Sequence, residues 1–112
     1  MNRTGSDPFA ELRRQYRAEA ASRAAFFAAA ARALREAGAG GTDLVALRQA
    51  AHRLAGSAGI YGFPELGQKA RALEEALLPV LQEGAPLDAP RVADLAADLA
   101  QFLAALGAGE PR

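Results

Sequence analysis

The sequence predicts an all-α fold, an up-down antiparallel four-helix bundle, and three observations support this prediction. Alanine is abundant and β-branched residues are scarce, a composition that favours helix over strand. Apolar residues recur at helical spacing in four segments. The connections between these segments are short, so consecutive helices are expected to lie antiparallel. The 112 residues suit one domain, with an ordered core of about residues 7–107 and a short tail at each end.

The first helix is expected from about Pro8 to Ala37. Ser6 and Asp7 can cap its beginning, and Pro8 suits the first helical turn. The helix is long, which leaves a kink or a break near Ala21–Ser22 open. Glycines are expected to end it, namely Gly38, Gly40 and Gly41.

The other three helices have comparable boundary signals. The second is expected from about Asp43 to Tyr61, with Thr42 or Asp43 as its cap. The third opens at Pro64, and Pro79 should kink or stop it near Leu78, because proline lacks the backbone N–H and clashes with the preceding turn. The fourth is expected from about Ala89 to Leu106, with a cap at Asp88.

Composition excludes several classes of function. Thirteen basic and thirteen acidic residues balance, which argues against a general binder of nucleic acid or of anionic membranes. The absence of cysteine excludes disulfides, thiolate catalysis and cysteine-ligated zinc. The start of the chain has no secretory signal, and the most apolar stretch, AAFFAAAARAL, is about half a membrane span and contains Arg32. We therefore expect a soluble cytoplasmic protein.

His52 is the only histidine, and it is predicted to face outward from the second helix. At about 100° per residue, it lies roughly 130° from the centre of the apolar stripe of that helix. Gly56 follows one turn later on the same face, and Gly59 lies beyond it. Each glycine weakens a helix by about 1 kcal/mol relative to alanine. Either another helix packs on these glycines, or a partner approaches His52 closely; for Gly56 access is the better explanation, and for Gly59 both remain open.

Most other sites find no support in the sequence. A lone histidine, judged by composition alone, is more often a surface residue without a role. One histidine and scattered carboxylates do not make a metal-ligand set, so no metal site is expected. The stretch GSAGIYG follows no strand and lacks the ending of a phosphate-binding loop. No motif places a base beside Ser57.

Residues 51–77, AHRLAGSAGIYGFPELGQKARALEEAL, resemble the histidine-containing phosphotransfer (HPt) domain. The family pattern is Ala-His-x-Leu-Lys-Gly-Ser-Ala-x-x-x-Gly, then a leucine and a helix that ends in Leu-Glu. The motif covers about a quarter of the chain and fixes residue types across two helices and their turn. The positions in register are Ala51, His52, Leu54, Gly56, Ser57, Ala58, Gly59, Gly62, Leu66, Leu73 and Glu74.

The resemblance implies a phosphoryl carrier of a two-component phosphorelay that is not itself an enzyme. His52 would accept a phosphoryl group from the aspartyl phosphate of a receiver domain, or from a hybrid histidine kinase, and pass it to another receiver domain. The chain would need no cofactor of its own, since the receiver supplies Mg²⁺. Receiver domains of response regulators and a hybrid histidine kinase are the expected partners of a monomeric chain.

The resemblance also implies roles for the surroundings of His52. Glu74 flanks the apolar stripe of the third helix by about 70° and would accept a hydrogen bond from Nδ1–H, which leaves Nε2 free. The family usually has lysine three residues after the histidine, where this chain has Ala55. Arg48 and Arg71 are the candidates for the missing cation near the phosphoryl group. Lys69 ranks below Arg71, and Arg53 points more to the side.

Rival functions remain open. The first is the same fold without phosphorylation, a binding module that docks to a receiver or kinase and inhibits or scaffolds it; Ala55 favours this reading. The second is a structural helical bundle that assembles with itself. A true enzyme has little support, because the chain has no nucleotide-binding loop. Docking is expected on the exposed face of the second and third helices, with apolar contacts at Val45, Ile60 and Leu78.

Overall fold

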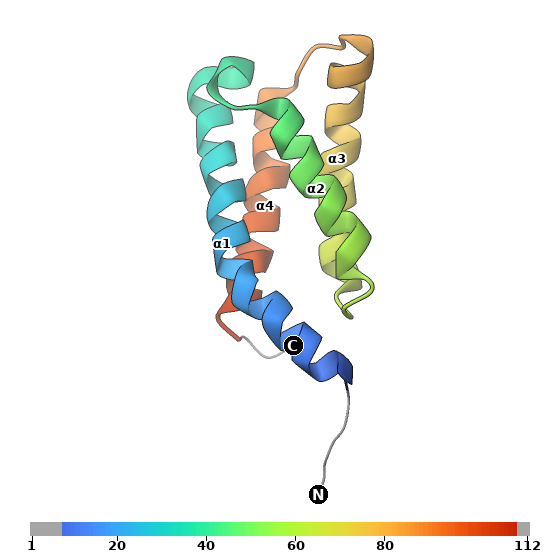
Figure 1. Ribbon diagram of the computed structural model, residues 1–112. Coiled ribbons are helices and arrows are strands. Elements are labelled where there is room, and N and C mark those ends of the chain that lie inside the picture. Colours follow the sequence, from blue (N-terminus) through green and yellow to red (C-terminus); the bar gives the residue numbers. More distant parts are fainter. Residues whose placement is uncertain (1–7, 110–112) are drawn as a thin grey trace, which may run out of the picture.

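The computed structural model describes residues 8–109, and within them the chain forms four α-helices and no strand. Figure 1 shows the helices packed side by side, each running opposite to the next. The prediction of an all-α antiparallel four-helix bundle is confirmed. A short 3₁₀ helix joins the first two. The elements are α1 (Pro8–Ala37), η2 (Gly38–Gly41), α2 (Leu44–Ala58), α3 (Pro64–Glu83) and α4 (Ala89–Gly107).

Helix α1 is one continuous element, without a break at Ala21–Ser22. Its N-terminal part turns away from the axis of the rest and passes beneath the turn between α2 and α3 (Figure 1). The predicted caps Ser6 and Asp7 lie outside the described residues. The predicted glycine ending is confirmed: Gly38 has φ +59°, and a Cβ on Gly41 would lie 2.5 Å from the carbonyl oxygen of Ala33. Only glycine fits that close approach.

Helix α2 begins at its cap and ends earlier than expected. Of the two cap candidates, Asp43 accepts a hydrogen bond from the backbone N–H of Ala46 at 3.1 Å. The helix ends at Ala58, not near Tyr61, because the chain turns over residues 59–63. In this turn Gly62 has φ +91°, and the N–H of Phe63 donates to the carbonyl of Ala58 at 2.8 Å. The turn sends the chain directly back along α2.

The expected stop of the third helix near Leu78 is wrong. Helix α3 runs through Pro79 to Glu83 and ends where Gly84 adopts φ +68°, with its N–H donating to the carbonyl of Pro79. Proline removes one helical hydrogen bond. Leu77 is buried before it, and Leu81 packs against the core after it. Apolar burial on both sides of Pro79 therefore keeps the last turn helical. The fourth helix begins as predicted, with Asp88 accepting from the N–H of Arg91 at 3.1 Å.

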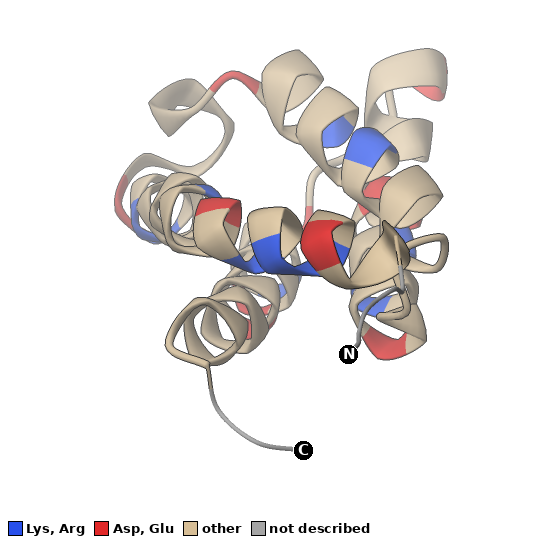
Figure 2. Ribbon diagram, turned by 60° about the horizontal axis from the view of Figure 1, so that its bottom comes forward, with Lys and Arg blue, Asp and Glu red and all other residues tan. Residues whose placement is uncertain are grey.

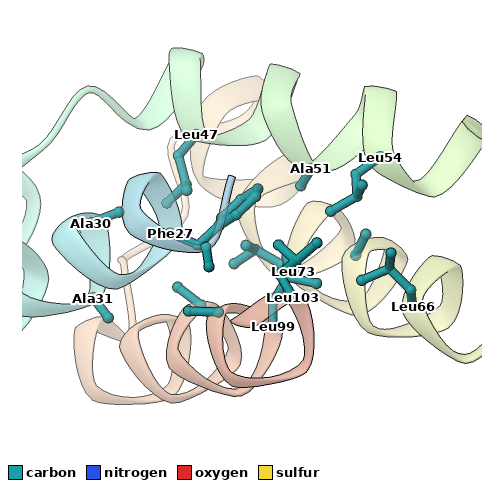
Figure 3. Close-up of a cluster of buried hydrophobic side chains, with 14 of the residues drawn as sticks. Phe27, Ala30, Ala31, Leu47, Ala51, Leu54, Leu66, Leu73, Leu99 and Leu103 are labelled. Atoms are coloured by element: carbon teal, nitrogen blue, oxygen red, sulfur yellow. The ribbon is translucent and has the colours of Figure 1, made fainter. Parts of the chain in front are cut away.

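The core lies along the axis of the bundle, and all four helices contribute to it (Figure 3). Helix α1 packs mainly against α4, and α2 packs mainly against α3. Much of the packing uses alanine, which lets helices approach closely. The side chains labelled in Figure 3 are Phe27, Ala30 and Ala31 of α1, Leu47, Ala51 and Leu54 of α2, Leu66 and Leu73 of α3, and Leu99 and Leu103 of α4.

The surface carries both signs of charge. Figure 2 shows basic and acidic positions interspersed on the helices, in keeping with the formal net charge of zero. Within residues 8–109 no helix combines the length and the apolar character that a membrane crossing needs.

Candidate functional site

His52 lies on the exposed ridge of α2, as its position on the helical wheel predicts. Its side chain is 64 % exposed, so the ring stands clear of the core and is open to solvent. Its Nδ1 atom lies 2.7 Å from Oε2 of Glu74 on α3. This contact joins two helices and holds one side of an otherwise open ring.

Glu74 is the one charged side chain in the buried class among the described residues, at 8 % exposure. A buried carboxylate is costly unless it is paired and hydrogen-bonded. Glu74 has two partners on the same oxygen, because Arg48 Nη1 donates to Oε2 at 3.1 Å. The His52 ring and the Arg48 guanidinium, both from α2, therefore offset the cost of burying the Glu74 carboxylate of α3.

The contact with Glu74 sets the protonation pattern of the His52 ring. A carboxylate can only accept hydrogen bonds, so Nδ1 of His52 is the donor at 2.7 Å. In a neutral imidazole the other nitrogen then carries a lone pair. Nε2 lies on the side of the ring away from Glu74, and the arrangement presents an exposed nucleophilic nitrogen to an incoming group.

The close approach of α2 and α3 is what brings Glu74 to His52. A Cβ on Gly67 of α3 would lie 3.5 Å from the carbonyl oxygen of Ala55 and 3.6 Å from the Cβ of Ala58. Small residues on both helices thus keep the two backbones near one another. Ala55, where the family pattern has lysine, is half-buried at this junction.

The glycines after His52 do not serve helix packing. Gly56 and Gly59 are exposed, and a Cβ on either would meet nothing within 4 Å. Of the two explanations that the sequence left open, packing by another helix is therefore wrong for both positions. The glycine that does lie between α2 and α3 is Gly67. What remains around His52 on its C-terminal side is a bare stretch of helix.

The four predicted cations have different surroundings. Arg48 is joined to Glu74, whereas Arg71 is exposed and forms no ion pair within residues 8–109. Lys69 turns toward α4, where its Nζ lies 2.9 Å from Asp98 Oδ2 and 5.9 Å from the centre of the Phe102 ring. The hydrogen bond to Asp98 raises the pKa of Lys69 above its usual value. Arg53 is exposed on the opposite side of α2 from Arg48.

The N-terminal part of α1 is attached to the end of α2 by a contact that no sequence pattern indicated. The hydroxyl groups of Tyr16 and Ser57 lie 2.9 Å apart. The Tyr16 ring also packs on Tyr61 and Phe63, with centroids 4.8 and 5.6 Å away. Burial raises the pKa of the Tyr16 phenol, against the opposing effect of the hydrogen bond to Ser57.

No group of three or more histidine, cysteine or acidic side chains gathers to hold a metal ion within residues 8–109. The site consists of the exposed imidazole of His52, the buried Glu74 carboxylate that accepts a hydrogen bond from its Nδ1, and the Arg48 guanidinium that donates to the same carboxylate. The chemistry that such a site supports is nucleophilic attack by Nε2 on an electrophile that a partner brings.

Comparison with known proteins identifies the family of the chain. The model of the Hpt domain matches residues 11–109 of the 112-residue chain. No curated protein and no solved structure matches the chain. A match over nearly the whole chain, together with the four-helix architecture, leads to one conclusion: the chain belongs to the Hpt domain family, whose members are phosphotransfer intermediates of phosphorelays, not enzymes in their own right, and interact with receiver domains.

Proposed function

We propose that this protein carries a phosphoryl group on His52, which it accepts from the aspartyl phosphate of a receiver domain or from a hybrid histidine kinase and passes to another receiver domain. The observation that carries the proposal is the pairing of an exposed ring with a buried acceptor. His52 is 64 % exposed, while its Nδ1 lies 2.7 Å from a carboxylate oxygen of Glu74. The His52 ring is therefore open to a partner, while the hydrogen bond to Glu74 fixes its orientation.

The transfer step needs no further catalytic group from this chain. Nε2 of His52 attacks the phosphorus of the aspartyl phosphate, the N–P bond forms, and the P–O bond to aspartate breaks. The aspartate leaves as a carboxylate, and the proton on Nδ1 stays in place. The phosphorylated ring is then formally cationic, and the Glu74 carboxylate faces that charge. Transfer to a second receiver runs the same step in reverse, with Mg²⁺ held by the receiver partner.

Arg48 and Arg71 take different parts in this proposal. The guanidinium of Arg48 is engaged by Glu74 at 3.1 Å, which favours a positioning role: it fixes the carboxylate that fixes the ring. Arg71 is exposed on α3 and has no ion-pair partner within residues 8–109, so it is the better candidate for a cation that meets the phosphoryl group. Ala55 supplies no charge of its own.

Gly56 and Gly59 serve access in this proposal. A Cβ on either glycine would meet nothing within 4 Å, so neither position adds a side chain that an approaching receiver would meet. Val45 precedes His52 on the same ridge, because seven residues are close to two helical turns. Val45 is exposed, as is Ile60 in the turn after α2. These two side chains are proposed apolar contacts for the partner, whereas Leu78 is half-buried.

A transfer assay tests the proposal directly. A panel of receiver domains carrying radiolabelled aspartyl phosphate is mixed with the wild-type chain and with His52→Gln. We expect an acid-labile, base-stable label on the wild type and none on His52→Gln. Phosphoramidate, a small phosphoryl donor, tests the reactivity of the ring without any docking. ATP and Mg²⁺ alone should leave the wild type unlabelled.

A second candidate function is a binding module that docks to a receiver or kinase without being phosphorylated. Ala55 favours it, because the charge that the family pattern places near the phosphoryl group is missing. The same panel separates the two functions. A receiver that binds the wild-type chain, with no label on His52 from that receiver or from phosphoramidate, would establish the binding module and reject the carrier.

A further inference from the structure

The N-terminal part of α1 is joined to the rest of the fold by one buried side chain. Residues 8–19, which we call the α1 arm, leave the axis of the helix and pass beneath the turn between α2 and α3 (Figure 1). Tyr16 is the one buried side chain among them, whereas α1 is buried at regular intervals from Ala20 to Leu34. The position of the α1 arm therefore depends on a single anchor.

The α1 arm begins where α4 ends. A Cβ on Gly107, the last residue of α4, would lie 3.0 Å from the backbone nitrogen of Ala21 and 3.5 Å from the Cβ of Ala20. The backbones of α1 and α4 are thus in close contact at this point. Because α4 goes no further, the arm extends past the end of the helix on which α1 mainly packs.

The anchor of the α1 arm is attached to the last turn of α2. The hydroxyl groups of Tyr16 and Ser57 lie 2.9 Å apart, and the Ser57 hydroxyl donates to the carbonyl oxygen of Leu54 at 3.4 Å. Since Ser57 has a single hydroxyl proton, Tyr16 is the donor to Ser57 Oγ. Two successive hydrogen bonds therefore connect the arm to a backbone carbonyl close to His52 in the sequence.

The α1 arm also contacts the turn that follows α2. The Tyr16 ring packs on the rings of Tyr61 and Phe63, with centroids 4.8 and 5.6 Å away. The guanidinium of Arg17 lies over the same Phe63 ring, 5.6 Å from its centre. Aromatic packing and a cation–π contact both stabilise the closed arm. The arm thus holds the end of α2 and the turn after it together.

The last turn of α2 is intrinsically weak. Ser57 lies between Gly56 and Gly59, and both glycines lower the stability of the helix. A Cβ on either would meet nothing within 4 Å, so neither glycine gains packing in return. Gly67 of α3 supports this turn from one side, and the hydrogen bond from Tyr16 supports it from the α1 side. The α1 arm therefore compensates for the two glycines that leave the helix bare after the histidine.

We propose that Tyr16 is a positioning residue for phosphotransfer: the closed α1 arm keeps the last turn of α2 in one conformation, and opening of the arm releases that turn and slows transfer from a receiver domain. The inference rests on the proposed function, because it concerns the presentation of the same histidine. Tyr16 forms no hydrogen bond with His52 or Glu74 and acts through Ser57. With one buried anchor, the arm can open while the bundle stays folded.

Amide hydrogen exchange tests the contact itself. The reporters are the amides of Tyr61 and Phe63, which donate to the carbonyls of Ser57 and Ala58 in the turn. Tyr16→Phe keeps the ring and removes the hydroxyl. We expect it to speed the exchange of these amides about fivefold, the effect of losing one hydrogen bond on a local opening. In Ser57→Ala the same substitution should have little further effect, because the two hydroxyls act as one contact.

Tyr61→Phe is the matched control. It removes a phenolic hydroxyl from the same aromatic cluster, but this hydroxyl forms no hydrogen bond within residues 8–109. Exchange of the Phe63 amide should therefore stay within twofold of the wild type. Unchanged exchange in Tyr16→Phe, or an equal acceleration in Tyr61→Phe, overturns the inference.

Phosphotransfer tests the consequence for the reaction. Tyr16→Ala removes the anchor, so the arm should be open in most molecules, and transfer from a phosphorylated receiver domain should slow about tenfold. Labelling by phosphoramidate should stay within twofold of the wild type, because the contact of His52 with Glu74 lies on the α3 side. A role confined to stability would not separate the two donors. Transfer at the wild-type rate in a folded Tyr16→Ala chain overturns the inference.

Two checks keep the possible failures apart. Circular dichroism shows whether Tyr16→Ala is folded, and if it is not, the exchange rates in Tyr16→Phe decide the inference. If the wild type takes no label from any donor, the carrier function fails instead. The exchange rates then still show whether the α1 arm holds the end of α2.

Discussion

The two flanks of α2 are built differently. On the α3 flank, small residues bring the backbones together, and Glu74 is buried against His52 and Arg48. On the α1 flank, the helices stand apart, and long arginine side chains line an open groove. A fixed hydrogen-bond geometry needs a closely packed and partly desolvated setting, whereas recognition needs accessible surface. One helix therefore has a side that orients the ring and a side that is open to a partner.

The largest expected effect belongs to the α3 flank. Glu74→Ala removes the acceptor for Nδ1 of His52, so the ring loses its orientation and the carboxylate that faces the phosphorylated form. We expect the phosphotransfer rate to fall on the order of 100-fold, the size typical of losing one group that stabilises charge in the transition state. Glu74→Gln can still accept a hydrogen bond through its amide oxygen, so its phosphotransfer rate should lie between those of the wild type and Glu74→Ala. A rate for Glu74→Ala within twofold of the wild type would contradict the assigned role of the carboxylate.

A smaller effect is expected at Arg48, which touches Glu74 and acts on His52 through it. Arg48→Gln should slow phosphotransfer about tenfold, equivalent to about 1.4 kcal/mol of transition-state stabilisation. Arg48→Lys should recover most of the rate. The tautomer of His52, followed by ¹⁵N chemical shifts, should shift away from Nδ1–H in Arg48→Gln, which a merely structural role for Arg48 would not cause.

A companion variant sharpens the Arg48 prediction. Ala55 lies on the same flank of α2 as Arg48, so Ala55→Lys can bring a cation back to this side of His52. By itself, Ala55→Lys should not abolish transfer. In the Arg48→Gln background it should raise the rate. An unchanged His52 tautomer and an unchanged phosphotransfer rate in Arg48→Gln would show that Glu74 orients the ring without Arg48.

The smallest expected effect concerns Gly56, which lies one turn after His52 on the exposed face of α2 between these two flanks. Gly56→Ala adds a methyl group in open space and removes a helix-weakening residue, so it should raise the free energy of unfolding by up to about 1 kcal/mol in urea denaturation. Receiver binding should weaken, because the methyl group lies beside His52. Gly84→Ala is the control: its positive φ of +68° should make the same substitution destabilising. A Gly56→Ala chain that is more stable and binds receivers as well as the wild type would leave Gly56 without a role in access.

Much of the site follows from local sequence. The outward position of His52 is a matter of counting residues along a helix, and the structure agrees with the count. The boundaries of α1 and α4 follow from their glycine, proline and aspartate signals, because capping depends on neighbouring residues. The resemblance to the HPt domain pointed to Glu74, and the structure places it 2.7 Å from the ring. The match of the Hpt domain model confirms the family.

Other features needed the packed helices. Pro79 favoured a stop in α3, but the burial of apolar residues on both sides of it outweighed one lost hydrogen bond. Arg48 and Lys69 are both surface cations by sequence, and only the packing assigns one to Glu74 and the other to Asp98. Gly56 and Gly67 are alike as glycines, yet one faces open space and the other lies against α2.

By itself, the sequence determined the four helices, the side of α2 on which His52 stands and the family to which the chain belongs, because each depends on residue order within one or two adjacent helices. Only the tertiary structure decided which side chains share Glu74, how closely α3 lies against α2 and how far α1 stands from it. These depend on the volumes of side chains from segments distant in the chain. Periodicity reports the direction of a side chain from its own helix, not what it meets there.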